Sequence, residues 1–331
     1  MNEAYISGTG SWLPERILTN GDLERMVDTS DAWIIQRTGI KERRIVAEGQ
    51  ATSDLAIGAS RRAIEAAGLT PEDMGAIILA TITPDTYVPA CAVYVQEALG
   101  AKNAFAFDLN AACTGFIYAT AIGAGMIQSA LCRHVLVIGA ESLSRIVDYT
   151  DRNSCILFGD GAGAAVISPV PEGMGAQGSR IVDSYLRSNG SDADFIQMPA
   201  GGSRKPASAE TLAAREHFLR LKGKEVFKFA TKTLAELLDI AVERNGIGLQ
   251  DLDLVIPHQV NYRIIESALR RSNLPEEKIY LNLDRFGNTS AASVPIAIDE
   301  AVRNGRLRKG NLVLLVAFGA GMTWGYNLIR W

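Results

Sequence analysis

The sequence predicts an α/β protein built from two similar halves, because the order of its segments is repeated. In the first half a helical pattern ends at Gly68, and an Asp-containing turn leads into the apolar run 76–80. In the second half a helical pattern ends at Gly246, and a similar turn leads into the apolar run 254–256. Apolar runs without polar alternation are typical of strands buried on both faces of a sheet. Repetition of the same order indicates a duplicated unit.

A second repeated feature is a run of small residues that opens a helix and precedes another strand. Cys113 stands in one such run, and the strand predicted over 135–138 follows its helix. Asn288 stands in the other, ahead of a helix predicted over 295–302 and a strand over 312–316. We therefore expect Cys113 and Asn288 to occupy equivalent helix starts, which the symmetry of the halves brings together at the centre.

The boundary between the halves falls in residues 169–210, which are rich in Gly, Pro, Ser and Asp and are expected to form surface connections. We divide the chain into an N-terminal half, 1–170, and a C-terminal half, 171–331. Neither composition nor length indicates a true interdomain linker, so the halves are expected to form one compact unit.

Local patterns predict the remaining elements of the first half. Residues 5–10 are expected to form a short strand that runs into a glycine turn, and residues 20–27 a helix. A Ser-Asp start resembling an N-cap opens a short helix over 30–40. Apolar positions keep a helical period over 52–67, and a glycine follows.

The middle of the chain contains a helical pattern over 117–127 that is too apolar and too rich in Ala and Gly for a surface helix. A strand over 134–141 follows. Residues 158–167 are expected to form a glycine-rich turn leading into a strand, because no Gly-Lys-Ser/Thr follows that would indicate a phosphate loop. A helix is predicted over 227–245.

The composition is that of a globular protein with a net charge of −4, which gives no reason to expect nucleic-acid binding. The four cysteines form no C-x-x-C pair, so we expect no disulfide framework, no metal site and a cytoplasmic location. The first twenty residues do not resemble a signal peptide. Two charge-free windows, 109–132 and 310–329, are diluted by small and polar residues; we expect a buried helix and a buried strand pair there, and no membrane span.

Cys113 is a candidate nucleophile because it stands at the start of the apolar helix. The positive end of a helix dipole lowers a thiol pKa from its usual value of about 8.5, so we expect a reactive thiolate near neutral pH. A packed core cysteine is the alternative that this stretch alone leaves open.

Of the three histidines, His134 and His217 are interpreted as structural. His258 directly follows the predicted strand 254–256, at the end where parallel strands present functional groups. With Cys113 and Asn288 it can form a hydrolytic triad in which the histidine is the base. Alternatively, the histidine and the asparagine can donate hydrogen bonds to an enolate oxygen. Spacing alone does not choose between the two.

Six segments in order resemble the β-ketoacyl-acyl carrier protein synthases III, condensing enzymes of the thiolase superfamily that start bacterial fatty-acid synthesis. The resemblance runs from Tyr5 to Trp331. It is carried by Asp31-Ala32-Trp33 with Arg37-Thr38-Gly39-Ile40, Ala111-Ala112-Cys113, residues 158–164, Pro257-His258-Gln259, residues 287–291, and Phe318-Gly319-Ala320-Gly321.

The resemblance implies a thiolase-like five-layer αβαβα fold, a homodimer and an acyltransferase that uses no cofactor beyond its coenzyme A thioester substrate. It implies that Cys113 takes the acyl group of an acyl-CoA while the backbone N–H groups of Cys113 and Ala320 hold the oxyanion. His258 and Asn288 then stabilise the enolate formed when malonyl-acyl carrier protein loses carbon dioxide. Elongating relatives use two histidines there, so Asn288 favours the initiating type.

The resemblance also implies a coenzyme A pocket. Trp33 and Arg37 match the pair that binds the nucleotide end, although a core Trp beside a surface ion pair is the alternative reading. The other positions that match the pocket are Thr29, Arg152, Phe227 and Asn261.

A basic helical face after His258 is a candidate docking surface for the acidic carrier protein, with solvated arginines as the alternative. Its residues are Arg263, Arg270 and Arg271, to which Lys222, Lys224 and Lys228 are possible additions.

The sequence departs from the family at the acyl tunnel. Val88 stands where members that take acetyl primers carry Phe. The smaller valine side chain would leave room in the acyl tunnel for longer or branched primers. Val260 and Met322 also differ from the residues usual in the family. A related acyltransferase or condensing enzyme of secondary metabolism is the alternative function. A catalytically inactive carrier-binding subunit is disfavoured, because Cys113, His258 and Asn288 are all present.

Overall fold

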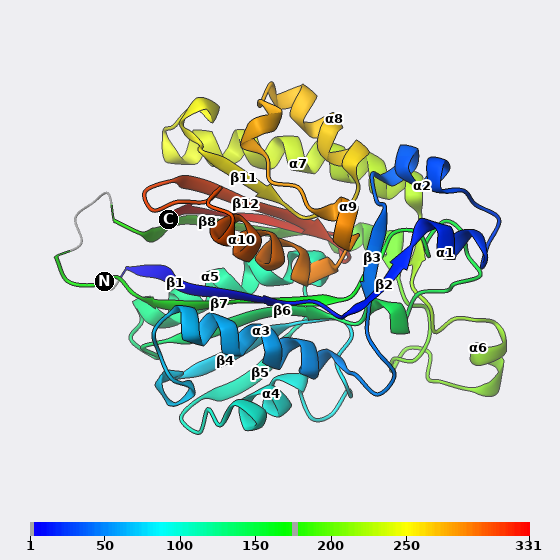
Figure 1. The fold of residues 1–331 in the computed structure, drawn as a ribbon, viewed down its shortest axis with the longest axis horizontal. Helices are drawn as coiled ribbons and strands as arrows, with labels where there is room; N and C mark the ends of the chain where they lie inside the picture. The colour runs from blue at the N-terminus through cyan, green and yellow to red at the C-terminus, as the bar shows by residue number, and fades with distance from the viewer. Residues whose placement is uncertain (1–2, 174–177) are drawn as a thin grey trace.

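The fold contains two mixed β-sheets, one from each half of the chain, in a computed structural model that describes residues 3–173 and 178–331 (Figure 1). The strand order is β1-β7-β6-β4-β5 in the first sheet and β11-β12-β13-β8 in the second. The strands are β1 (Ala4–Trp12), β4 (Ala76–Ala80), β5 (Phe105–Leu109), β6 (Val135–Glu141), β7 (Gly161–Pro169), β8 (Arg180–Ser188), β11 (Leu254–Pro257), β12 (Leu312–Gly319) and β13 (Thr323–Arg330).

Helices cover both outer faces of the two sheets and fill the space between them, which gives five layers (Figure 1). The outer layers are α3 (Thr52–Ala66) with α4 (Cys91–Leu99), and α7 (Gly223–Asn245) with α8 (Tyr262–Ser272); the central layer is α5 (Gly115–Gln128) with α10 (Ser293–Arg303). Shorter elements are β2 (Arg16–Thr19), α1 (Asn20–Glu24), α2 (Asp31–Thr38), β3 (Glu42–Ile45), β9 (Ile196–Gln197), α6 (Ala209–Ala213), β10 (Arg220–Leu221) and α9 (Leu283–Phe286). The predicted five-layer α/β fold is confirmed.

The two sheets repeat one another. In each, a parallel strand pair, β4 with β6 or β11 with β12, is followed by an antiparallel strand, β7 or β13. The single-turn 3₁₀ helices η2 (Ala112–Thr114) and η7 (Ser290–Ala292) precede the two central helices. The duplicated unit predicted from the sequence is therefore present, while the boundary at residue 170 stays a prediction.

The expectation of surface connections over 169–210 is wrong for residues 180–188. These residues form β8, which pairs with β13 at the edge of the second sheet. The strand is polar and partly exposed, so it lacks the apolar run by which the buried strands are recognised.

The expected glycine turn after residue 7 is also wrong, because Gly8 and Gly10 lie inside β1. A Cβ at Gly8 would lie 2.4 Å from the carbonyl oxygen of Ala63, and a Cβ at Gly10 would lie 2.4 Å from that of Ala59. The two glycines therefore allow the α3 backbone to pack directly on the strand.

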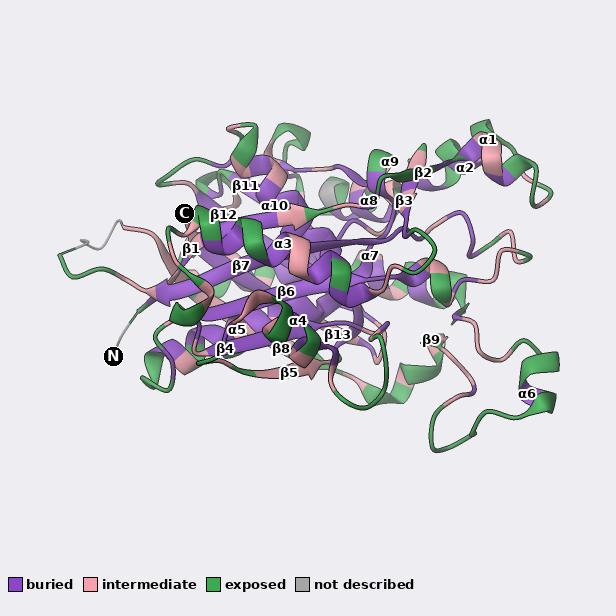
Figure 2. Ribbon diagram, turned by 60° about the horizontal axis from the view of Figure 1, so that its bottom comes forward, coloured by how far each residue is buried: buried purple, intermediate pink, exposed green. Residues whose placement is uncertain are grey.

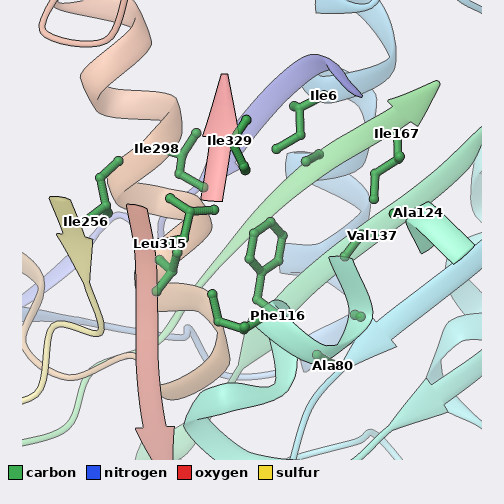
Figure 3. Packing of buried hydrophobic residues seen from close by; sticks show 14 of the residues in the cluster. Ile6, Ala80, Phe116, Ala124, Val137, Ile167, Ile256, Ile298, Leu315 and Ile329 are labelled. Carbon is green, nitrogen blue, oxygen red and sulfur yellow. The ribbon is translucent and has the colours of Figure 1, made fainter. Parts of the chain in front are cut away.

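All residues of β4, β6 and β12 are buried, and the central helices pack between the two sheets (Figure 2). Phe116 of α5 is fully buried between the sheets, in one cluster with Val137 and Ile167 of the first sheet and Leu315 of the second (Figure 3). This burial accounts for the apolar window 109–132, and the β12–β13 pair accounts for the window 310–329, as predicted. In the part of the chain that the structure describes, no helix is long and apolar enough to cross a membrane.

Replacing Gly8 tests the β1–α3 contact. We expect Gly8→Ala to lower the free energy of unfolding by about 1–3 kcal/mol, because the new methyl group meets backbone atoms that cannot rotate away. The control is Gly21→Ala in α1, where the nearest atom to the new Cβ is 3.8 Å away. Urea unfolding of both variants measures the difference, and equal stability would contradict the packing argument.

Candidate active site

Cys113, His258 and Asn288 lie on three different elements and line one cavity of about 640 Å³. Cys113 is in η2 at the start of α5, and His258 follows β11. Asn288 lies between α9 and η7. β5 leads into the turn that carries Cys113, β11 leads into His258, and Asn288 forms an isolated bridge with Phe158. The fold thus brings together the three residues that the sequence singled out.

The surroundings of Cys113 keep its thiol protonated. Cys113 is half-buried, and burial raises its pKa to about 12; a hydrogen bond with the Ser290 side chain lowers the pKa, and the Glu141 carboxyl raises it. The expectation of a lowered pKa is therefore wrong for this state of the protein, because the loss of hydration outweighs the helix start. The thiol needs a proton acceptor or a bound substrate before it can react as a thiolate.

His258 is buried and neutral. Its Nδ1 lies 2.7 Å from the Ser293 hydroxyl, which also accepts a hydrogen bond from the Gln259 N–H at 3.4 Å. Burial lowers the pKa of His258 to about 3. When the Ser293 hydroxyl, which already accepts one hydrogen bond, donates to Nδ1, the proton of the neutral imidazole is on Nε2. Within the described residues Nε2 has no hydrogen-bond partner, so it is free to donate to a substrate.

Asn288 is held by its own backbone turn. The side-chain Oδ1 of Asn288 accepts a hydrogen bond from the Ser290 backbone N–H at 2.9 Å, and the backbone N–H of Asn288 donates to the Leu157 carbonyl at 2.9 Å. Because Oδ1 is engaged, the side-chain NH₂ is the group available to a substrate in the cavity.

The expected equivalence of Cys113 and Asn288 needs correction. Asn110 accepts the Ala112 N–H at 3.4 Å, as Asn288 accepts that of Ser290, and Ala112 and Ser290 share a left-handed backbone with φ of 47° and 49°. Asn110 is thus the counterpart of Asn288, and the position equivalent to Cys113 is Ala291. The periodic pattern located both helix starts but was too coarse to align them by residue.

Most residues of the predicted coenzyme A pocket gather at the mouth of the cavity. Trp33, Arg37, Phe227 and Asn261 line it. Arg152 lies outside the lining, but its guanidinium carbon is 4.7 Å from the Trp33 ring centre; that of Arg37 is 5.7 Å away.

Other predicted site residues lie further away. Thr29 is not in the lining, and Val88 is 86 % exposed, so this chain does not place Val88 in its own cavity. Ala320 follows Gly319, which lines the cavity against Cys113. Arg263 is at the mouth, whereas Arg270 and Arg271 are exposed on α8.

Sequence reasoning missed two residues that contact the site. Ser293 contacts His258, and Glu141 contacts Ser290. The sequence signal that could have identified Glu141 is its place as a charged residue at the end of the apolar strand 135–141. Among residues 3–173 and 178–331, no group of three or more His, Cys, Asp or Glu side chains is placed to hold a metal ion.

Comparisons with known proteins agree with this architecture, which is that of the thiolase-like condensing enzymes. Residues 107–190 match the model of 3-oxoacyl-[acyl-carrier-protein (ACP)] synthase III, and residues 242–331 match its C-terminal model. The chain belongs to the 3-oxoacyl-[acyl-carrier-protein] synthase III family.

Relatives cover the full length of the chain. The beta-ketoacyl-[acyl-carrier-protein] synthase III of Caldanaerobacter subterraneus is 55% identical over 99% of this chain and 98% of its own. That of Natranaerobius thermophilus is 49% identical over 100% of both chains. The crystal structure of 3-oxoacyl-[acyl-carrier-protein] synthase III from Aquifex aeolicus superposes with a TM-score of 0.90 at 43% identity, over 99% of this chain and 100% of that one.

Proposed function

We propose that this chain catalyses the decarboxylative condensation of an acyl-CoA primer with malonyl-acyl carrier protein, the step that initiates fatty-acid synthesis. The observation that carries the proposal is the meeting of a thiol, a neutral imidazole and a side-chain amide in one cavity. The names of the full-length relatives, beta-ketoacyl-[acyl-carrier-protein] synthase III, support the same reaction.

In the first half-reaction Cys113 attacks the thioester carbonyl. The backbone N–H groups of Cys113 and Ala320 stabilise the oxyanion, coenzyme A leaves as its thiolate, and the acyl group stays on sulfur. The close approach of Gly319 supports this arrangement, because a Cβ there would lie 2.7 Å from the Cys113 nitrogen.

In the second half-reaction the malonyl group loses carbon dioxide and the enolate carbon attacks acyl-Cys113. Charge builds on the thioester oxygen, where His258 Nε2–H and the Asn288 amide donate hydrogen bonds. A histidine whose pKa is about 3 is a poor base for a thiol at neutral pH. The low pKa of His258 therefore favours the condensing arrangement over the hydrolytic triad.

The mouth of the cavity suits coenzyme A, which is a substrate here and not a cofactor. Trp33 offers an indole face, while Arg37, Lys224 and Arg263 supply positive charge for phosphates. Arg152 packs beside Trp33 and is placed to contribute as well. The secondary-metabolism alternative uses the same site, but no separate feature favours it.

We also propose a homodimer that works in the cytoplasm. β5 ends the first sheet and pairs with β4 alone, and its residues, including the apolar Phe105 and Phe107, are exposed or partly exposed. An edge strand of this kind is suited to pairing with a second copy. The four free thiols support a reducing compartment.

Separate assays of the two half-reactions test the proposed roles. Cys113→Ala should form no acyl adduct with acyl-CoA, as judged by intact mass, whereas Cys91→Ala should form it. Asn288→Ala should lower decarboxylation and condensation by about 10²- to 10³-fold, the usual effect of losing one such donor, and acylation much less. Equal loss in both half-reactions would support the hydrolytic triad instead.

Primer length tests the proposed role of Val88, which in this fold requires a second copy to carry it into the acyl tunnel. Val88→Phe should reduce turnover of long acyl-CoA primers about tenfold or more and spare acetyl-CoA, because one methylene of fit contributes about 1 kcal/mol. A panel of acyl-CoA chain lengths measures this. An unchanged chain-length profile would mean that Val88 does not set the tunnel depth.

Charge reversal tests carrier-protein docking on Arg263, Arg270 and Arg271. Arg271→Glu should raise the KM for malonyl-acyl carrier protein several-fold and leave turnover of malonyl-CoA unchanged, because a rim charge acts mainly on association. The matched control is Lys309→Glu, an exposed cation in the loop before β12. An equal effect of both variants would argue against docking on α8.

A further inference from the structure

Glu141 is a fully buried carboxyl group beside the active site. It ends β6 and has no exposed surface. Its Oε2 accepts hydrogen bonds from the hydroxyls of Thr81 at 3.1 Å and Thr83 at 2.6 Å and from the N–H of Ile82 at 3.1 Å. None of these partners is a cation. Burial of a carboxylate without a cation is costly, so its presence calls for an explanation.

Ser290 connects this carboxyl group to the nucleophile. Its hydroxyl donates to Glu141 Oε1 at 3.0 Å. Ser290 is in η7, which packs on the η2 turn that carries Cys113, and the interaction of its side chain with Cys113 lowers the thiol pKa. Ser290 thus lies between the Cys113 thiol at the cavity and the Glu141 carboxyl group in the first sheet.

We propose that Ser290 and Glu141 form a proton relay that removes the thiol proton of Cys113 during acylation and returns it after condensation. The proposal rests on the proposed function, in which Cys113 is the nucleophile. Before acylation the Ser290 O–H donates to the Glu141 carboxylate, which leaves Ser290 Oγ free to accept the thiol proton.

Acylation moves two protons by one step each. The S–H proton passes to Ser290 Oγ, the Ser290 proton passes to Glu141, and the sulfur electron pair forms the bond to the acyl carbon. The bond from that carbon to the coenzyme A sulfur breaks, and the departing thiolate takes a proton from solvent. Condensation later releases the Cys113 thiolate, which recovers its proton from Glu141 along the same path.

The surroundings of Glu141 make both of its protonation states accessible. Burial raises its pKa to about 7, while hydrogen bonds from Thr83, the Ile82 N–H, Ser290 and Thr81 lower it. Glu141 also acts electrostatically on the Cys113 thiol and raises its pKa. A carboxyl group that titrates near neutral pH is suited to accept and return a proton.

The substitution Ser290→Ala should leave the local backbone intact. Ser290 has a left-handed backbone, with φ of 49°, and the equivalent Ala112 adopts φ of 47° as an alanine. The contact with Asn288 is made by the Ser290 N–H, which an alanine keeps. The variant therefore removes the hydroxyl without removing the support of Asn288.

The test is the single-turnover rate of Cys113 acylation by acyl-CoA between about pH 5.5 and 9, followed by quenching and intact mass. In the wild type we expect the rate to rise with pH as Glu141 deprotonates, with a midpoint near 7, and then to level off. Glu141→Gln and Ser290→Ala should each lower the rate at pH 7 by about 10²-fold, a typical contribution of positioned proton transfer, and should abolish this step in the profile.

Asp160→Asn is the matched control for loss of a buried carboxylate. Asp160 is also fully buried and accepts hydrogen bonds from Val46 and Ser144. We expect this variant to keep the wild-type pH profile. If Glu141 merely raises the thiol pKa by its charge, Glu141→Gln acylates as fast as the wild type or faster, and the relay is overturned.

A second measurement separates the relay from a change in the shape of the site. Decarboxylation of malonyl-CoA by a Cys113→Ala protein does not include removal of the thiol proton, so adding Ser290→Ala should lower it far less than Ser290→Ala lowers acylation. An equal loss in both reactions would show that the substitution distorts the site around Asn288 and would overturn the relay. A wild type that forms no adduct on Cys113 would refute the proposed function itself, whereas adduct formation with unaltered pH profiles in both variants would refute the relay alone.

Discussion

The contact between the two helix starts at the centre of the molecule constrains everything around it. η2 and η7 contact each other, and each also packs tightly on a strand. A Cβ at Gly139 of β6 would lie 2.2 Å from the Ala291 carbonyl of η7, and one at Gly319 of β12 would lie 2.7 Å from the Cys113 nitrogen of η2. Backbone therefore packs on backbone where the sheets end. This contact requires the runs of small residues and fixes the two central helices relative to each other.

Burial at this contact decides the electrostatics of the site. The same loss of hydration that keeps His258 neutral also keeps the Cys113 thiol protonated and lets the Glu141 carboxyl hold a proton near pH 7. A neutral imidazole is useful as a hydrogen-bond donor, but a protonated thiol is not a nucleophile. In the proposed reaction the dry site therefore assists decarboxylation, whereas acylation requires a proton acceptor for the thiol.

The sequence predicts most of the central architecture, because long buried elements have strong periodic signals. β4 spans the predicted 76–80, and α3 spans nearly all of 52–67. The polar edge strand β8 and the glycines inside β1 were not recognised, since pairing and close helix packing are long-range properties. The pKa direction at Cys113 failed for the same reason: the helix start is local, but burial depends on the whole fold.

The two halves have diverged in a way that gives each a different chemical task. Equivalent positions hold Cys113 and Ala291, so one half supplies the thiol and the other leaves a methyl group where a second sulfur would stand. The equivalent pair one residue earlier is Ala112 and Ser290. Here the C-terminal half carries the polar side chain, and the Ser290 hydroxyl interacts with the thiol of the N-terminal half. Because the contact crosses the symmetry axis, neither half contains a complete site. The two halves share the same backbone arrangement, and the side chains that differ at equivalent positions give the site its chemistry.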